Sequence, residues 1–399
     1  MIPLMINAFY NEQDTRRALA CFILDAKNRL SMGPQCLEFE RQFALFQGRH
    51  YAVLFNSGSS ANLALLQAMK ILGYLRDGDT VGFSALTWAT NVMPIIQMNL
   101  IPVPVDIETN TLNVSSRTLG NTLDDSYLRV LFLTNALGFA GDLDRIASMC
   151  RDDDCVLIED NCESLGSELR LNSNIPASTK TGNFGLASTF SFYAAHHIST
   201  IEGGMVCTDN QDLDENLRMV RAHGWDRDLR YERKQKIRDK YDINNELYAR
   251  YTFYDLAFNI RPTEVTGFLG IKQLAYLPEI IAKRQANFLR VDEAIRQNED
   301  LIPVLHDNLV VKSIFTLPII ARSPVLKSKY IERFSTRGIE VRPVIAGNIQ
   351  SQPFYKKYVR RKFRLPGAET VDAQGFYSGN CPEYDEKQID TIIGAINGP

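Results

Sequence analysis

The chain has 399 residues, 45% of them hydrophobic, so it is long enough to bury a large core and to form two domains. Its formal net charge of -3 excludes a general attraction to nucleic acids or to anionic membranes. No uninterrupted apolar run approaches the roughly 18–20 residues of a membrane helix, and the N-terminus has no signal-peptide pattern. We therefore expect a cytoplasmic protein without nucleic-acid or membrane partners.

Short apolar segments, typical of strands, alternate with helix-like segments along the first half of the chain. The predicted strands are residues 51–55, 80–83, 101–105, 129–134, 155–159, 187–192 and 205–208. After the first of them, Leu63, Leu66 and Met69 stand at helical spacing within residues 61–75. The alternation indicates an α/β fold with a mainly parallel sheet.

After about residue 290 the pattern of predicted helices and strands changes. The predicted elements there are helices at 291–297 and 325–336, strands at 314–317 and 339–344, and a terminal helix from Glu386. This mixture is typical of a smaller α+β domain. We predict a large domain of residues 1–285 and a small C-terminal domain of residues 286–399.

Seven cysteines are scattered along the chain without a Cys-x-x-Cys pair: Cys21, Cys36, Cys150, Cys155, Cys162, Cys207 and Cys381. An odd number at wide spacing indicates neither a disulfide framework nor a zinc site. We interpret them as reduced thiols used as small core residues, and we predict no metal site.

Residues 56–60, Asn-Ser-Gly-Ser-Ser, join the first strand to the first of these helices. Backbone N–H groups at a helix N-terminus can bind an anion, and the Ser59 and Ser60 hydroxyls can add donors. Helix caps favour the same residues, so an ordinary cap is the alternative. Trp88 follows the next strand, where composition alone favours a core residue.

Asp160 follows the strand predicted at residues 155–159. Ligands of open parallel sheets gather beyond the carboxyl ends of the strands. A carboxylate in that place can pair with a protonated ring nitrogen of a ligand. A solvated carboxylate that caps the next helix is the alternative.

Residues 191–204 read Ser-Phe-Tyr-Ala-Ala-His-His-Ile-Ser-Thr-Ile-Glu-Gly-Gly. This segment resembles the cofactor-anchoring stretch of the DegT/StrS-type sugar aminotransferases, which hold pyridoxal 5'-phosphate (PLP) as an imine on a lysine. With the leading Ser-Phe and the trailing Glu-Gly-Gly aligned, His196 takes the place of that lysine. An imidazole has no primary amine for an imine, but it moves protons near neutral pH. His196 is therefore the predicted catalytic residue.

The resemblance implies the aspartate aminotransferase fold, fold type I, and a PLP site. Its predicted cofactor-binding residues are Gly58, Ser59, Ser60, Trp88, Asp160, Glu163, Ser191 and Asn259. In the family pattern Asp160 pairs with the pyridine nitrogen, which makes PLP an electron sink, and Trp88 stacks on the ring. Glu163 stands where the aminotransferases usually carry a glutamine, so an acidic group close to the cofactor is expected.

The resemblance also implies a homodimer with a shared active site. Asn259 matches an asparagine that reaches the cofactor phosphate from the neighbouring subunit. Arg261, two residues further on, can hold the carboxylates of L-glutamate, because a guanidinium binds a carboxylate through two hydrogen bonds. An ordinary surface arginine ahead of Pro262 is the alternative.

Two histidine-bearing subgroups of the family are similar to this chain. The CDP-4-keto-6-deoxyglucose 3-dehydrases add an iron–sulfur cluster held by four cysteines, whereas only Cys207 and Cys381 follow His196 here, so no cluster is expected. The GDP-4-keto-6-deoxy-D-mannose 3-dehydratases need no cluster and take their amino group from glutamate. Residues 199–204 and 342–348 look closer to the second subgroup, although the role of residues 342–348 stays open.

The resemblance therefore implies a nucleotide-sugar 3-dehydratase of deoxysugar biosynthesis, of the kind that supplies O-antigen. L-Glutamate converts PLP to pyridoxamine phosphate (PMP), His196 moves the proton, and the sugar loses its C3 hydroxyl. The alternatives are another sugar enzyme of the family, either an aminotransferase-like enzyme or a cluster-independent CDP-sugar dehydrase, and a catalytically silent PLP-fold binding module. Two basic stretches, residues 227–240 and 356–364, can meet the diphosphate or can be solvated surface.

Overall fold

A computed structural model describes residues 1–171 and 178–398. Within these residues the largest sheet has seven strands, in the spatial order β1 (Tyr51–Phe55), β9 (Gly204–Thr208), β8 (Ala187–Ser191), β5 (Val156–Asp160), β4 (Val130–Thr134), β2 (Thr80–Ser84) and β3 (Ile101–Val105). Six of these strands run in the same direction, and only β9, which lies between β1 and β8, runs in the opposite direction. The prediction of an α/β fold with a mainly parallel sheet is confirmed.

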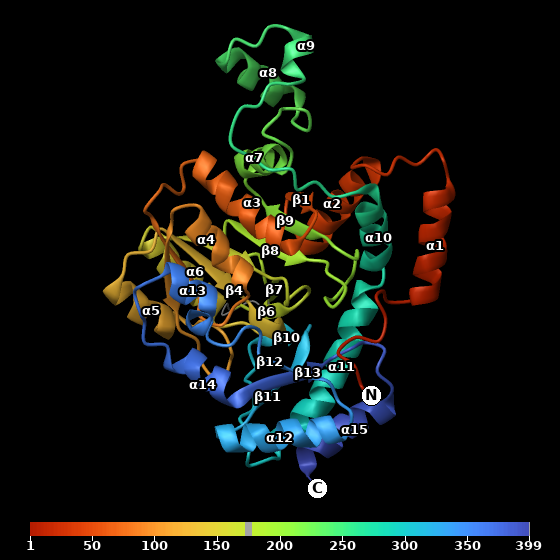
Figure 1. The fold of residues 1–399 in the computed structure, drawn as a ribbon, viewed down its shortest axis with the longest axis vertical. Coiled ribbons are helices and arrows are strands. Elements are labelled where there is room, and N and C mark those ends of the chain that lie inside the picture. Colours follow the sequence, from red (N-terminus) through yellow and green to blue (C-terminus); the bar gives the residue numbers. More distant parts are fainter. Residues whose placement is uncertain (172–177, 399) are drawn as a thin grey trace.

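Helices cover both faces of this sheet (Figure 1). They are α2 (Pro34–Gln47), α3 (Gly58–Ile71), α4 (Met93–Gln97), α5 (Ser116–Asp125), α6 (Leu143–Asp152), α7 (Gln211–Arg221) and α10 (Glu264–Leu274), with the short turns η1 (Ala89–Asn91) and η2 (Ala136–Gly138). The helix α1 (Glu12–Leu24) lies outside them against α10, where Phe22 stacks on Phe268. Alternate side chains of a strand point to opposite faces. Accordingly Val53 and Phe55 of β1 pack with α3, whereas Leu54 packs with Phe39 and Phe43 of α2.

The C-terminal part forms a smaller unit below the large sheet (Figure 1). Its sheet has the order β11 (Thr316–Ile320), β13 (Gly375–Gly379), β12 (Val341–Pro343), and its other elements are α12 (Pro324–Thr336), α14 (Pro366–Gln374) and α15 (Glu386–Asn397). The segment with η3 (Ile349–Ser351) and α13 (Pro353–Tyr358) packs instead on the large domain, where Ile349 and Tyr355 join the core that contains Phe83. The helix α11 (Leu277–Arg296) leads into it. The predicted domain division at residue 285 lies within α11 and stays a prediction.

Smaller features complete the chain. A further sheet joins β10 (Leu309–Val311), β6 (Glu168–Arg170) and β7 (Ser178–Lys180). The N-terminal segment reaches the small domain, where Ile2 pairs with Ile339. None of the helices in the described ranges is both long enough and apolar enough to span a bilayer.

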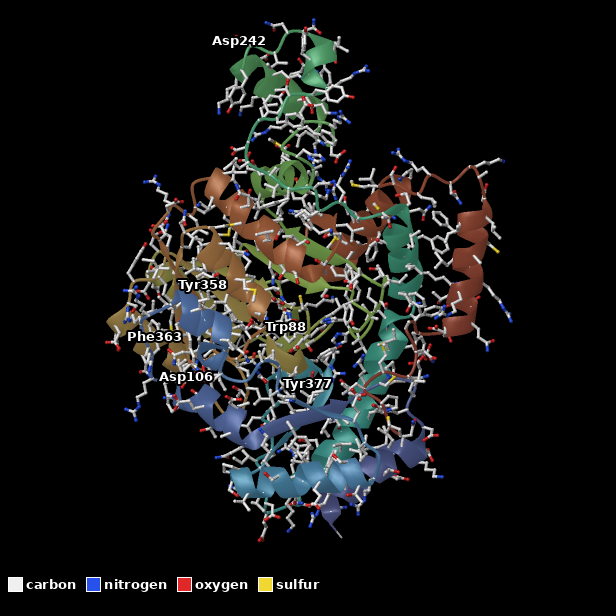
Figure 2. All side chains as sticks on the ribbon, viewed as in Figure 1. Trp88, Asp106, Asp242, Tyr358, Phe363 and Tyr377 are labelled. Atoms are coloured by element: carbon white, nitrogen blue, oxygen red, sulfur yellow. The ribbon has the colours of Figure 1, made fainter. Side chains whose placement is uncertain are left out.

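A helical arm projects from the top of the large domain (Figure 1). It contains α8 (Tyr231–Lys240) and α9 (Glu246–Ala249), and Asp242 lies at its tip (Figure 2). No residue of α8 is buried. The arm therefore has little core of its own in a single chain.

Candidate active site

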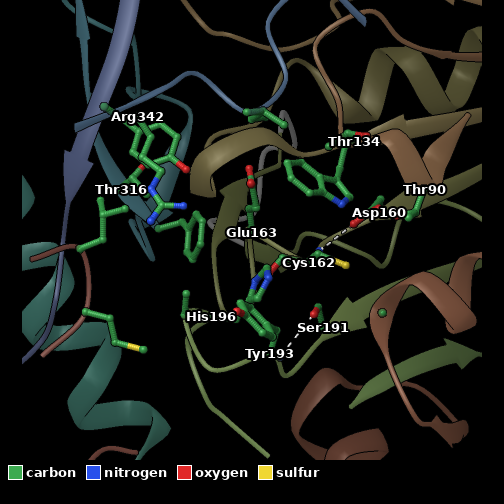
Figure 3. Close-up of a pocket in the computed structure, with 18 of the residues that line it drawn as sticks. Thr90, Thr134, Asp160, Cys162, Glu163, Ser191, Tyr193, His196, Thr316 and Arg342 are labelled. Carbon is green, nitrogen blue, oxygen red and sulfur yellow. Dashed lines mark hydrogen bonds between the residues drawn. The ribbon is translucent and has the colours of Figure 1, made fainter. Parts of the chain in front are cut away.

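A cavity of about 540 Å³ opens between the carboxyl ends of the parallel strands and the small domain. Asp160 of β5 and Ser191 of β8 line one side, and Arg342 of β12 and Tyr377 of β13 line the other. Figure 3 shows Glu163 and His196 between these two walls. The size and the mixed polar and apolar lining are typical of a small-molecule site.

One end of the cavity is formed by the start of α3. The Ser57 side chain accepts a hydrogen bond from the Ser60 N–H, which caps the helix. A Cβ on Gly58 would lie 2.7 Å from the Ser191 Cβ, so only glycine fits where α3 meets β8. Ser59 and Ser191 line the cavity beside Gly58, whereas the Ser60 hydroxyl lies 3.0 Å from that of Ser57. A helix N-terminus flanked by hydroxyls fits a phosphate group.

Asp160 forms the floor of the cavity and is only 4% exposed. Its Oδ2 accepts hydrogen bonds from Asn62 Nδ2 at 3.1 Å and Asn91 Nδ2 at 2.7 Å. Its Oδ1 accepts one from the Cys162 N–H at 2.8 Å, drawn as a dashed line in Figure 3. These bonds fix the plane of a carboxylate at the cavity wall, as a partner for a protonated pyridine nitrogen requires. The two asparagines had no signal in the sequence.

His196 lies in the loop between β8 and β9, in a turn closed by its own N–H and the Tyr193 carbonyl. Its Nδ1 is 2.7 Å from the Cys162 carbonyl oxygen. A carbonyl only accepts, so the neutral ring carries its hydrogen on Nδ1 and leaves the Nε2 lone pair free. Burial lowers the pKa of His196 to about 4, although the Cys162 carbonyl and Asp160 act in the other direction. At neutral pH Nε2 is therefore a proton acceptor.

Glu163 lies beside His196 in the cavity (Figure 3). Burial raises the pKa of its carboxyl to about 7, and the charge of Asp160 adds to this effect. The Leu137 N–H donates to Oε2 of Glu163 at 2.9 Å, and this hydrogen bond lowers the pKa of the carboxyl. The carboxyl is therefore close to half-protonated at neutral pH.

The wall opposite Asp160 comes from residues that sequence reasoning did not assign to the site. Arg342 lies in the segment whose role stayed open, and it pairs with Glu340 at 2.8 Å. Burial raises the pKa of Tyr377 to about 12, with a further contribution from Glu163. Phe315 and Arg284 complete this wall. Apart from the 342–348 segment that contains Arg342, no local pattern marks these residues, because only the packing of the small domain brings them to the cavity.

Trp88 lines the cavity with 57% of its surface exposed. Figure 2 shows it in the same central region as Tyr377. Composition alone favoured a core residue at this position, and that interpretation is wrong. A flat aromatic face open to the cavity suits a residue that stacks on a ligand ring.

Three predicted residues, Ser60, Asn259 and Arg261, lie outside the cavity lining of this chain. Asn259 and Arg261 are both exposed, and Arg261 Nε donates to Asn259 Oδ1 at 3.0 Å. The Arg261 guanidinium lies 5.4 Å from the centre of the Trp225 ring. Their predicted roles therefore stay predictions. The described lining also contains no residue of the basic stretches 227–240 and 356–364.

Known proteins resemble this chain over nearly its whole length. GDP-4-keto-6-deoxy-D-mannose 3-dehydratase from Escherichia coli O55:H7 is 32% identical over 362 residues, which is 90% of each chain. The dTDP-4-dehydro-2,6-dideoxy-D-glucose 3-dehydratase of Saccharopolyspora spinosa is 30% identical over 400 residues, or 96% of this chain and 84% of that protein.

A solved structure shows the same fold. It is a GDP-4-keto-6-deoxymannose-3-dehydratase with a trapped PLP-glutamate geminal diamine, 29% identical, with a TM-score of 0.88 over 99% of this chain and 100% of that one. The likeness confirms fold type I. Residues 12–397 match the DegT/DnrJ/EryC1/StrS aminotransferase family, a family of PLP-dependent, sugar-modifying enzymes. The chain belongs to the DegT/DnrJ/EryC1/StrS aminotransferase family.

Proposed function

We propose that the chain is a PLP/PMP-dependent 3-dehydratase of a nucleotide-linked 4-keto-6-deoxyhexose, with GDP-4-keto-6-deoxy-D-mannose as its substrate. L-Glutamate provides the amino group that converts PLP to PMP, and the product is a 3,6-dideoxy-4-ketosugar. The observation that carries the proposal is the site of His196. No lysine is among the described residues that line the cavity, and the imidazole there holds a free Nε2. The names of both sequence relatives point to the same kind of reaction.

The residues of the cavity fit PLP without a covalent bond to the chain. Bound PLP supplies an electron-withdrawing pyridine and, as PMP, a primary amine. The N-terminus of α3 and the Ser191 hydroxyl would hold its phosphate, because the lack of a side chain on Gly58 lets Ser191 lie directly against the start of the helix at the cavity. Asp160 would hold the pyridine nitrogen in its protonated form. Trp88 would cover one face of the ring.

His196 would move the proton that the elimination needs. Nε2 would accept the proton lost from the C4' carbon of the cofactor and, as the imidazolium, would donate it to the hydroxyl that leaves sugar C3 as water. Because burial lowers the pKa of His196 to about 4, its imidazolium is a stronger acid than an ordinary histidine. A lysine amine, with an ordinary pKa near 10.4, would hold the proton far more tightly. A low pKa therefore favours the loss of water.

We infer also that a second copy of the chain completes the site. The Arg261 bond uses the Asn259 carbonyl oxygen, so the Asn259 amide N–H groups remain available to donate to a phosphate. Both side chains are exposed and lie outside the cavity of their own chain. In a homodimer they would supply a phosphate contact and a carboxylate contact to the partner's site.

The test is a substrate panel with the purified protein, PLP and L-glutamate. GDP-, CDP- and dTDP-linked 4-keto-6-deoxyhexoses are incubated separately, and sugar products, 2-oxoglutarate and ammonia are measured. The proposal expects a GDP-sugar product that has lost the C3 oxygen, with 2-oxoglutarate and ammonia released together. A stable 4-amino sugar would show an aminotransferase instead. Turnover with the CDP-sugar alone would support a cluster-independent CDP-sugar dehydrase. The absence of any product and of 2-oxoglutarate would favour a silent binding module.

A further inference from the structure

The ring of Phe315 stacks on the imidazole of His196. The two ring centres are 5.1 Å apart and the planes are inclined by 17°. His196 belongs to a loop of the large sheet, whereas Phe315 immediately precedes β11 of the small domain. The contact therefore joins the two parts of the chain at the predicted base.

The main chain of Phe315 is held on both sides. Its N–H donates to the Leu137 carbonyl at 2.9 Å, and its carbonyl accepts from Arg284 Nη1 at 2.7 Å. Arg284 is only 5% exposed and also donates to the Asn380 carbonyl at 2.8 Å. Its guanidinium lies 5.9 Å from the centre of the Phe315 ring. Phe315 is thus fixed by a loop of the large domain and by α11.

One hydrogen bond does not fix the direction of a histidine ring. The bond from Nδ1 to Cys162 leaves the imidazole able to tilt about that contact, and a tilt moves Nε2 across the cavity. A flat ring stacked on one face removes this freedom and keeps water away from that face. Arg284, with no carboxylate partner among the described ion pairs, adds a positive charge that disfavours the imidazolium.

We propose that Phe315 is a positioning residue for His196, which holds the imidazole plane and excludes water so that Nε2 points to one place in the cavity. The base is then complete only when the small domain lies against the large one. The inference rests on the proposed function in that it takes His196 as the base. The titratable and charged groups around the imidazole are Asp160, Cys162, Glu163, Tyr193, His197, Glu202, Arg284, Glu340, Arg342 and Tyr377.

The test uses the full chain labelled with ¹⁵N-histidine, and NMR follows His196 across pH. The signals are assigned by their loss in His196→Asn. Phe315→Leu keeps an apolar side chain but removes the flat ring, and Phe315→Tyr restores the ring. Phe288→Leu is the matched control, since it removes a core ring whose centre lies 5.1 Å from that of His306, another histidine.

Phe315→Leu should raise the protonation midpoint of His196 by about one pH unit or more, because water reaches the ring. With substrate, kcat should fall about tenfold while KM changes less than about twofold, as expected for lost orientation. Phe315→Tyr should restore the protonation midpoint and kcat. Phe288→Leu should lower Tm but leave the midpoint and kcat unchanged. If Phe315→Leu does not fold, Phe315→Met gives the same comparison.

An unchanged midpoint and kcat in Phe315→Leu, or the same shift in Phe288→Leu, would overturn the proposal. The titration needs no sugar. A lack of dehydration by the wild-type protein would therefore contradict the proposed function, while the His196 midpoint would still decide the role of Phe315.

Discussion

Glu163 and Leu137 are joined by a hydrogen bond of 2.9 Å from the Leu137 N–H to Oε2 of Glu163. Leu137 has a φ of 57°, a left-handed conformation that costs a residue with a side chain about 1–2 kcal/mol. Its carbonyl accepts from the Phe315 N–H on the other side. A single strained residue thus connects the acidic group beside His196 to the ring that stacks on it.

The pH dependence of turnover should show Glu163 and His196 as separate groups. The pKa of Glu163 is raised to about 7, so its carboxyl is neutral below that pH and anionic above it. His196, with a pKa near 4, becomes protonated only in acid. We expect Glu163→Gln to remove the inflection near pH 7 from the profile of kcat/KM and to retain the loss of activity towards pH 4. An inflection near pH 7 that persists in Glu163→Gln would assign it to another group.

Borohydride should not fix the cofactor to the wild-type protein, because the described cavity lining has no primary amine. His196→Lys should create a fixable bond, visible as added mass in the intact protein, and should abolish dehydration. His196→Gln is the control that changes the same residue without an amine, and it should remain unmodified. Full dehydratase activity in His196→Lys would contradict the role given to His196.

Asp160→Asn should preserve the fold but lower turnover by about three orders of magnitude, because an amide cannot keep the pyridine nitrogen protonated. The neighbouring Glu159 is the matched control. Its carboxylate is buried on the opposite face of β5 and accepts from the N–H groups of Gly182, Phe184 and Gly185. Glu159→Gln should therefore lower Tm more than turnover. Comparable losses of turnover in both variants would show that Asp160 serves the fold.

Dilution should release the cofactor if Asn259 reaches the phosphate of a second subunit. Cofactor binding and subunit association are then linked, so the apparent PLP affinity falls as dimers separate. Sedimentation and PLP fluorescence measured over the same dilution series would follow both events. Asn259→Ala should weaken PLP binding without separating the subunits. PLP affinity that is independent of protein concentration through dissociation would place Asn259 away from the cofactor.

Arg261→Ala should raise the glutamate concentration needed for half-maximal rate and should spare a single turnover that starts from preloaded PMP. The reason is that glutamate, whose carboxylates Arg261 would bind, takes part only in the half-reaction that converts PLP to PMP. Rapid quench from the PMP form separates the two halves. Equal losses in both assays would assign Arg261 to the sugar or to the fold.

Much of the large sheet could be predicted from the sequence, because buried parallel strands appear as short apolar runs between turns. The helix after β1 begins at Gly58, three residues before the predicted start, since Ser57 caps it through the Ser60 N–H. The helix predicted at residues 291–297 is only the end of α11, which begins at Leu277. The helical spacing of hydrophobic residues is weak in α11, because charged side chains interrupt the buried face of this helix.

The candidate site likewise has residues that could be located from the sequence and residues that could not. Asp160, Ser191, Trp88 and His196 could be located because they stand at strand ends or in a segment with a recognisable pattern. Phe315, by contrast, meets His196 only after the small domain has packed, and a contact between distant segments leaves no local signature. Long-range packing is therefore the part of the site that the sequence could not reveal.

The lack of buried residues in α8 affects how the sequences of related proteins can differ in this segment. None of its residues is buried, so changes there cost the fold of a single chain little, except at Arg233 and Arg238, which pair with the buried carboxylates of Glu215 and Asp226. Selection on the sequence of α8 must then act through the surfaces that this helix contacts outside the core of its own chain. Its sequence can drift together with that surface while the cavity around His196 stays constant, and the arm is the first place to examine for differences in partner preference among relatives.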